Sequence, residues 1–203
     1  MNIAISENRF YVSWDDYRTL DFDVDAIPFE CFRWVNGEIV DVPLEPVPNA
    51  AIARRLFSRF QNFIDDEDLP LVPGMKDLQV QTDGQTRIPD VMIISTALDD
   101  VLRNQTAGLI TREMEPPLLI VEVVSKSNRD TDLVDKTQEY AELGVAEYWT
   151  IDWDRSEPEI IVRTLNSNQT GYVSRCYKPG MSFTTDLLPG MTFAVDKVLK
   201  GRR

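Results

Sequence analysis

Two acidic residues stand within or beside runs of apolar residues, where a carboxylate is costly to ionise. Glu122 lies inside the apolar run 118–124, and its charge there costs several kcal/mol unless a partner compensates it. Asp90 directly precedes a second apolar run, "VMII". Two carboxylates a few ångströms apart repel each other and raise each other's pKa unless a divalent cation lies between them. The pair therefore predicts a site for Mg²⁺ or Mn²⁺.

A lysine follows on a segment with helical spacing. Lys136 lies between Leu133 and Tyr140 on a stripe spaced i, i+3, i+7, which faces the sheet if those two neighbours are core residues. An inward ammonium beside two acids suits hydrolysis. The acids hold the metal, the metal lowers the pKa of a bound water, and the lysine orients the nucleophile or neutralises developing charge.

A simpler interpretation is that Glu122 lies on a solvated strand face. Side chains alternate along a strand, so Glu122 shares its face with Ile120 and Val124. Because these neighbours are apolar, we favour a buried partner over solvent.

Composition narrows the possible chemistry. The chain has no histidine, which excludes His-based serine or cysteine triads and His-based zinc or iron sites. The net charge of −13 argues against a broad basic surface for nucleic acid. The first 48 residues hold ten acids and three basic residues, a net charge of −7, so the excess is concentrated near the N-terminus. Tight nonspecific DNA binding is therefore expected to need divalent cations, whereas a local phosphate site is not excluded.

Length and sequence pattern predict one domain, 1–203, with residues 1–28 as a peripheral N-terminal segment. The N-terminus lacks a basic region followed by a long apolar one, and no apolar run approaches the roughly 20 residues that span a bilayer. We therefore expect no membrane partner, a cytoplasmic location, and reduced, buried Cys31 and Cys176.

Strands and helices are expected to alternate around these residues. Asn36-Gly37 is a strong signal for a hairpin within 29–42, because type I′ turns need positive φ at both central residues. Helices are predicted over 50–64 and 131–144, the second with Asp130 or Thr131 as N-cap and Gly144 after its last turn. Strands are predicted over 77–82, 87–95, 118–124, 146–152, 159–165 and 171–177. The pattern indicates an α/β (α+β) domain with a central mixed β-sheet flanked by helices and an added N-terminal hairpin.

The segments "NGEIV", "RIPDVMII", "LLIVEVVSKSNRDTD" and "DKTQEYAELGVAEYW", in that order, resemble the PD-(D/E)XK nuclease superfamily. Within it the chain is similar to a bacterial family of restriction endonuclease-like proteins, from about Phe29 to the last strand. The resemblance implies a restriction endonuclease-like core. It also implies that Asp90 and Glu122 bind the metal, with the carbonyl of Val123 and the carboxylate of Glu38 as further ligands. Asn49 stands where other members often have a histidine.

The lysine departs from the superfamily pattern, which has a lysine two positions after the glutamate. Val124 stands there. The family resemblance implies that Lys136 on the following helix takes this role, and Lys126, with the right strand parity, is the rival.

The implied reaction is Mg²⁺- or Mn²⁺-dependent hydrolysis of a DNA phosphodiester, which would leave a 5′-phosphate. Cleavage of RNA stays open. A homodimer is expected, since two sites related by a two-fold axis can cut both strands. The alternatives are an inactive nuclease-fold binding or assembly module, and a phosphohydrolase acting on small phosphoesters.

Overall fold

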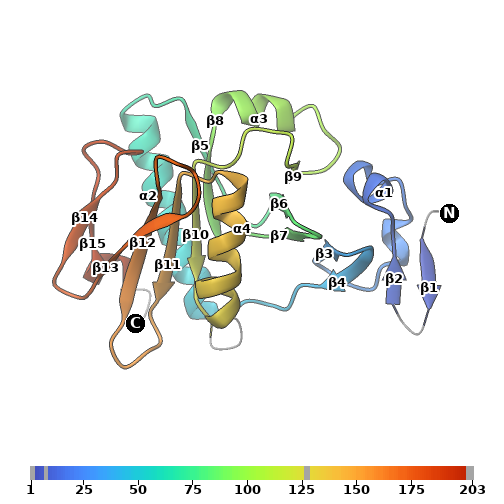
Figure 1. Cartoon of the computed structure of the whole chain (residues 1–203), viewed down its shortest axis with the longest axis horizontal. Helices are drawn as coiled ribbons and strands as arrows, with labels where there is room; N and C mark the ends of the chain where they lie inside the picture. The colour runs from blue at the N-terminus through green and yellow to red at the C-terminus, as the bar shows by residue number, and fades with distance from the viewer. Residues whose placement is uncertain (1–2, 7–8, 126–128, 200–203) are drawn as a thin grey trace.

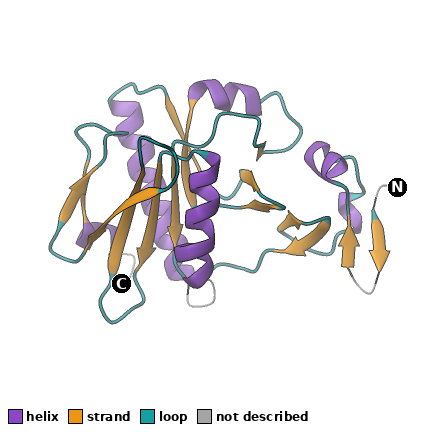
Figure 2. Cartoon of the chain, viewed as in Figure 1, coloured by secondary structure: helices purple, strands orange, loops and turns teal. Residues whose placement is uncertain are grey.

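Two β-sheets follow one another along the long axis of the molecule and carry helices on their faces (Figures 1 and 2). The computed structural model describes residues 3–6, 9–125 and 129–199. The predicted α/β class, with mixed sheets flanked by helices, is confirmed.

The six-stranded sheet contains the apolar strand that prompted the site prediction. Its spatial order is β13 (Tyr172–Tyr177), β12 (Glu159–Leu165), β11 (Glu147–Asp152), β10 (Leu119–Val123), β8 (Val91–Ser95) and β5 (Leu71–Gly74). Strands β10 and β11 run parallel and the other neighbours run antiparallel. Every residue of β10 is buried, as expected of a central strand covered on both faces.

Helices cover both faces of this sheet. Helix α2 (Val47–Asp66) packs on one face, with α5 (Val195–Leu199) and the small ribbon β14 (Ser182–Thr184) and β15 (Thr192–Ala194) completing that layer. A helical segment made of η2 (Thr131–Asp135) and α4 (Lys136–Leu143) covers the other. Because side chains alternate along β10, Leu119, Val121 and Val123 join the core beneath α2, whereas Ile120 faces Tyr140 of α4.

The seven-stranded sheet extends away from the first. Its order is β1 (Ala4–Ser6), β2 (Arg9–Tyr11), β4 (Glu38–Asp41), β3 (Phe32–Val35), β7 (Gln85–Arg87), β6 (Gln79–Thr82) and β9 (Leu109–Ile110). The predicted Asn36-Gly37 hairpin is confirmed, with φ values of 47° and 92°.

The N-terminal segment lies at one end of the molecule but is more than a loose extension. Strand β2 pairs with β4, and α1 (Trp14–Thr19) contributes the buried Tyr17 to a third hydrophobic cluster. The short helix η1 (Val24–Ala26) follows and buries none of its residues. Aromatic rings of the segment pack against Phe32 and Trp34 of the hairpin.

Two local expectations were wrong. Asp130 has helical φ and ψ and makes no side-chain cap, so the helix begins before the predicted N-cap. Cys31 and Cys176 are free, as expected, but both are exposed. In the described part of the chain, no helix combines the length and apolar character needed to cross a membrane.

Candidate active site

Asp90 and Glu122 are brought together by the pairing of β8 with β10. Val91 and Val121 are partners in this antiparallel pair, so the preceding Asp90 and the following Glu122 are adjacent. The Asp90 carboxylate fixes this arrangement, because its Oδ2 accepts a hydrogen bond from the Val123 amide at 2.7 Å. Both acids are buried, with 7% and 3% of their surfaces exposed.

The Glu122 carboxylate is held by two residues of α4. Lys136 Nζ lies 2.9 Å from its Oε1, and the Tyr140 hydroxyl donates to the same oxygen at 3.0 Å. Burial raises the pKa of Glu122 to about 7, Lys136 opposes the rise, and the charge of Asp90 adds to it. The structure thus supplies the buried partner that the sequence predicted for this acid.

Lys136 is shared between two acids. Its Nζ also lies 2.8 Å from Oδ1 of Asp132, one turn earlier. The two residues belong to the π-helical turn η2 and the first turn of α4, and turns of this kind are frequent at functional sites. Burial alone lowers the pKa of the Lys136 ammonium, but Glu122 and Asp132 outweigh that effect and raise it. The amine is therefore held as a cation.

A second lysine pairs with Asp90. Lys76 Nζ lies 3.2 Å from Asp90 Oδ1 and 2.9 Å from Oε2 of Glu45. Burial, and then the charge of Asp90, raises the pKa of Glu45 to about 7. Sequence reasoning missed Glu45 and Lys76, which lie in connecting segments without periodicity. Asp132 was missed as well, although its i, i+4 spacing to Lys136 could have revealed it.

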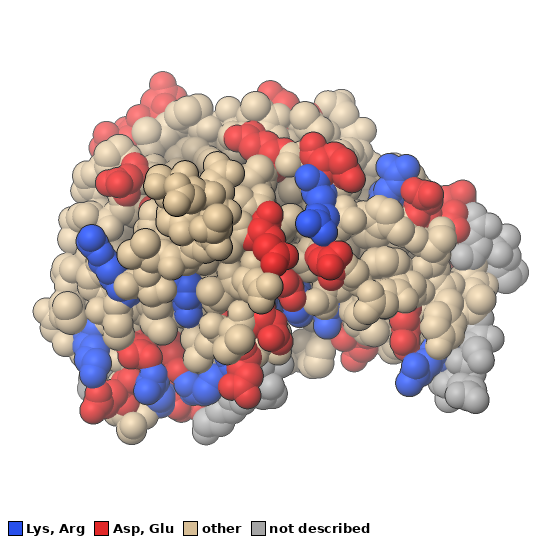
Figure 3. Space-filling model, viewed as in Figure 1, with Lys and Arg blue, Asp and Glu red and all other residues tan. Residues whose placement is uncertain are grey.

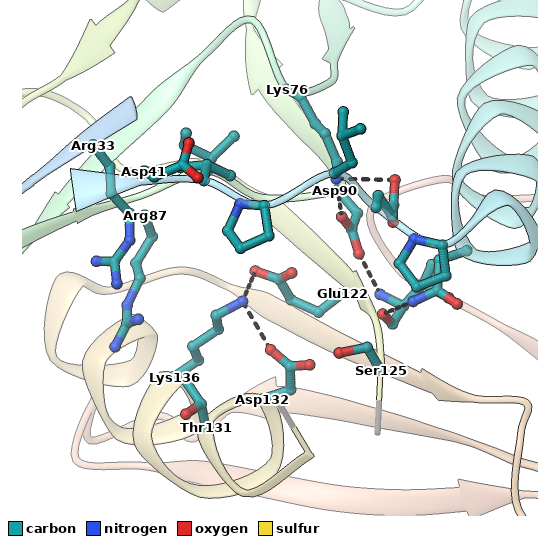
Figure 4. A pocket seen from close by; sticks show the side chains of 18 residues that line it. Arg33, Asp41, Lys76, Arg87, Asp90, Glu122, Ser125, Thr131, Asp132 and Lys136 are labelled. Atoms are coloured by element: carbon teal, nitrogen blue, oxygen red, sulfur yellow. Dashed lines mark hydrogen bonds and ion pairs between the residues drawn. The ribbon is translucent and has the colours of Figure 1, made fainter. Parts of the chain in front are cut away.

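These groups face one cavity of about 320 Å³ between the two sheets (Figure 4). The cavity is lined by Asp90, Glu122 and Lys136, so all three predicted catalytic residues come together. Five acids and four basic residues line it, namely Asp41, Glu45, Asp90, Glu122, Asp132, Arg33, Lys76, Arg87 and Lys136.

Asn49 joins the same site from the first turn of α2. Its Nδ2 donates to the Val123 carbonyl at 2.9 Å, and its Oδ1 accepts from Trp153 Nε1 at 2.7 Å. The buried amide therefore orients the main chain directly after Glu122. A carbonyl has two lone pairs, so the Val123 oxygen can accept this bond and still face a ligand.

Two predicted residues are not brought into this arrangement. Glu38 lies on β4 beside Arg9, at 3.6 Å, and is not among the residues that line the cavity within the described chain. Glu38 lies at the turn end of the hairpin, whereas Asp41 at the other end of β4 lines the cavity. Glu45 from the following loop shares Lys76 with Asp90 instead. Lys126, the rival lysine, lies outside the described residues.

The oxygen donors suit a hard divalent cation. Mg²⁺ is commonly bound through one or two carboxylates and retained waters, and Asp90, Glu122 and the Val123 carbonyl offer such donors. The repulsion between Asp90 and Glu122, part of the reason for the raised pKa of Glu122, is what a cation would relieve. Among residues 3–6, 9–125 and 129–199, no three His, Cys, Asp or Glu side chains gather closely enough to hold a metal by themselves.

A family model matches most of this chain. Residues 14–196 match Uma2, described as "Putative restriction endonuclease". The chain belongs to this family. No curated protein matches it.

A solved structure supports the nuclease fold of this family member. The chain resembles the crystal structure of "a putative nuclease belonging to DUF820" from Anabaena variabilis, with a TM-score of 0.67 and 13% sequence identity. The similarity covers 90% of this chain and 98% of that one. At this identity the likeness establishes the fold, and the predicted restriction endonuclease-like architecture is confirmed.

Proposed function

We propose that this chain is a metal-dependent endonuclease that hydrolyses DNA phosphodiester bonds with Asp90, Glu122 and Lys136 as catalytic residues. The observation that carries the proposal is the convergence of two buried acids and a lysine whose side chain is only 12% exposed in one cavity. A chain without catalytic duty gains little from burying such groups together, since each charge costs free energy to desolvate.

The proposed roles follow from the contacts. Asp90, Glu122 and the Val123 carbonyl would hold Mg²⁺ or Mn²⁺, which when bound activates water and neutralises phosphate charge. Lys136 is kept protonated by Glu122 and Asp132. It would therefore stabilise the negative charge that develops on the oxygens of the scissile phosphate in the transition state. Water attacks phosphorus, the bond to the 3′ oxygen breaks, and the products are a 5′-phosphate and a 3′-hydroxyl.

We infer a single domain over 1–203, a cytoplasmic location, and a homodimer whose two sites cut opposite strands. Lys126 stays a rival for the catalytic amine until both lysines are tested.

The catalytic assignment is tested by cleavage of supercoiled plasmid in Mg²⁺ or Mn²⁺. We expect Glu122→Gln and Asp90→Asn to lose all activity, and Lys136→Met to lose about 100-fold or more, the scale of a group that stabilises transition-state charge. Lys178→Met is the matched control, because Lys178 is exposed and pairs only with Glu157 among the described residues. Undiminished cleavage by folded Glu122→Gln protein would refute the site.

An inactive binding or assembly module is the second candidate. It is favoured by the two lysines, which already form ion pairs with Asp90, Glu45, Glu122 and Asp132 and offset two of their four negative charges without a metal. Calorimetric titration with Mn²⁺ separates the two functions. Binding that is lost in the Asp90→Ala/Glu122→Ala double variant supports the enzyme, and no binding at millimolar metal supports the module.

A further inference from the structure

A chain of polar contacts links the wall of the cavity to the helix that carries Lys136. Arg33 of β3 donates through Nη1 to Gln85 Oε1 at 2.8 Å, and Gln85 donates through Nε2 to Glu139 Oε1 at 3.1 Å. Arg87 closes the network with two hydrogen bonds to Glu139, at 2.8 and 2.5 Å. Glu139 lies one turn after Lys136 on α4. The network therefore joins the seven-stranded sheet to the catalytic helix.

Charge is not balanced within this network. Glu139 neutralises Arg87 through a paired, two-bond contact. Within the described part of the chain, Arg33 has no carboxylate at ion-pair distance, and its hydrogen bonds go to the neutral side-chain oxygen of Gln85 and the carbonyl of Thr86. Two arginines and one glutamate therefore leave this network, taken by itself, with one positive charge.

The Arg33 guanidinium keeps donors for a further partner. Both of its hydrogen bonds use Nη1, whereas a guanidinium has five N–H donors. Among the described residues, no hydrogen bond is found for Nε or Nη2, and neither atom is one of the buried atoms without a partner. Both atoms are therefore accessible from the cavity or from solvent. Burial, and then the neighbouring Arg87, lowers the pKa of Arg33. An anion arriving in the cavity would offset that cost.

The contact to Thr86 suggests a simpler role, in which Arg33 only ties β3 to β7. A purely structural tie could be made by a neutral donor, and it would not need a charge placed beside a second arginine. Figure 4 shows both guanidinium groups on the wall of the cavity, across from Asp90. On the face seen in Figure 3, acidic and basic side chains are interspersed. That face shows no broad basic patch for phosphate, so an individual contact such as Arg33 would have to provide local affinity.

We propose that Arg33 binds a backbone phosphate of the nucleic acid that occupies the cavity, with Arg87 and Glu139 holding the wall in place. The inference rests on the proposed nuclease function and adds a substrate-binding residue to it. A guanidinium fork matches the geometry of phosphate oxygens and can bind two of them at once. The ligand class is a phosphodiester strand, whose contact with Arg33 would fix its position relative to Lys136.

The test measures binding separately from cleavage. A fluorescent DNA duplex is titrated with full-length protein in Ca²⁺, and fluorescence anisotropy gives Kd at several salt concentrations. We expect Arg33→Gln to weaken binding about 10-fold or more, the scale for loss of a charge-assisted contact. The slope of log Kd against log salt should fall by about one, as for loss of one phosphate contact.

Two further variants define the controls. Arg175→Gln removes an exposed arginine of β13 and should change neither Kd nor slope. Arg33→Lys keeps the charge but loses the fork, so it should restore the slope and part of the affinity. If Arg33→Gln binds with the affinity and slope of the wild type, the inference is wrong. It is also wrong if affinity falls without a change in slope, which is the signature of a structural role, or if wild-type protein does not bind.

Cleavage of the same duplex in Mg²⁺ separates this inference from the proposed function. Wild-type protein that binds with the expected slope but never cleaves would overturn the nuclease activity and leave the phosphate contact standing. Wild-type protein that cleaves, while Arg33→Gln binds normally, would overturn the contact alone.

Discussion

Two glutamates are buried in the six-stranded sheet, and they are stabilised in different ways. Glu122 has the ammonium of Lys136 beside it. Glu147 accepts hydrogen bonds from the indole of Trp149 and the hydroxyl of Thr185, and no ion pair is found for it among the described residues. Burial raises the pKa of Glu147, and its two hydrogen bonds only partly oppose that rise. Burial outweighs the opposing partners at both positions, so the pKa of each glutamate stays raised.

The raised pKa of Glu147 predicts a specific dependence of stability on pH. Because the folded state raises the pKa of Glu147 above its unfolded value, folded protein retains the proton more readily. The stabilisation is present below the unfolded pKa and is lost as pH rises through the folded pKa. We expect Glu147→Gln to flatten this part of the profile, measured by urea unfolding at a series of pH values. Glu142→Gln, at an exposed position of α4, should keep the wild-type profile, and equal profiles for both variants would contradict the prediction.

At the residue scale, sequence reasoning located the groups whose burial is unusual. Glu122 and Asp90 could be found because an acid within or beside an apolar run needs a partner, and Lys136 because helical spacing turned it inward. Glu45 and Lys76 could not be found, since they lie in connecting segments whose path is set by tertiary packing. Arg33 alternates with apolar neighbours on a strand, a pattern that does not tell a site residue from a solvated one.

At the scale of elements, the helix behind Glu122 ends at a residue with a left-handed backbone. Gly144 has φ of 85°, and its amide donates to the carbonyls of Ala141 and Tyr140. A Cβ at this position would meet only Pro116 Cγ, at 3.8 Å. A Cβ atom therefore fits at this position, and only the left-handed backbone conformation opposes replacement of Gly144 by a larger residue.

We expect Gly144→Ala to lower the free energy of unfolding by about 1–2 kcal/mol, the usual cost of a left-handed conformation for an L-residue. Thermal and denaturant unfolding measure this loss. Gly171→Ala is the matched control, because a Cβ there meets nothing within 4 Å and φ is not positive. A Gly144→Ala protein as stable as this control would contradict the interpretation of the helix end.

Predicted helices and strands agree with the structure where a regular pattern of apolar residues extends over a long segment. The helix expected over 50–64 lies within α2, and the strands expected over 146–152 and 159–165 correspond to β11 and β12. Strand β5 was not predicted, because "LVPG" holds a proline and a glycine that ordinarily mark a loop. The π-helical turn η2 could not be predicted either, since its sequence reads as ordinary helix.

At the scale of the whole molecule, the cavity belongs to neither sheet alone. Arg33 and Arg87 come from the seven-stranded sheet, whereas Glu122 and Lys136 come from the six-stranded sheet and its helix. Sequence reasoning placed residues 1–28 at the periphery but did not foresee their own aromatic cluster, because scattered aromatic residues carry no pairing information. The site thus depends on how the two sheets meet.

The expected homodimer makes a prediction about products. Light scattering should give a mass of twice 23.3 kDa, and active dimers should convert supercoiled plasmid directly to linear DNA. Mixed dimers with one Glu122→Gln subunit should nick one strand, because each site cuts one phosphodiester. A monomer that only nicks would contradict the dimer while leaving the catalytic residues in place.

The two exposed thiols offer a direct way to follow the meeting of the sheets. Cys31 directly precedes β3 on one sheet, and Cys176 lies on β13 of the other. Native protein therefore carries one dye-attachment point on each of the two sheets that border the cavity. Energy transfer between donor and acceptor labels at these points reports the distance between them. It would show whether the two sheets move closer together when nucleic acid binds, without any engineered cysteine.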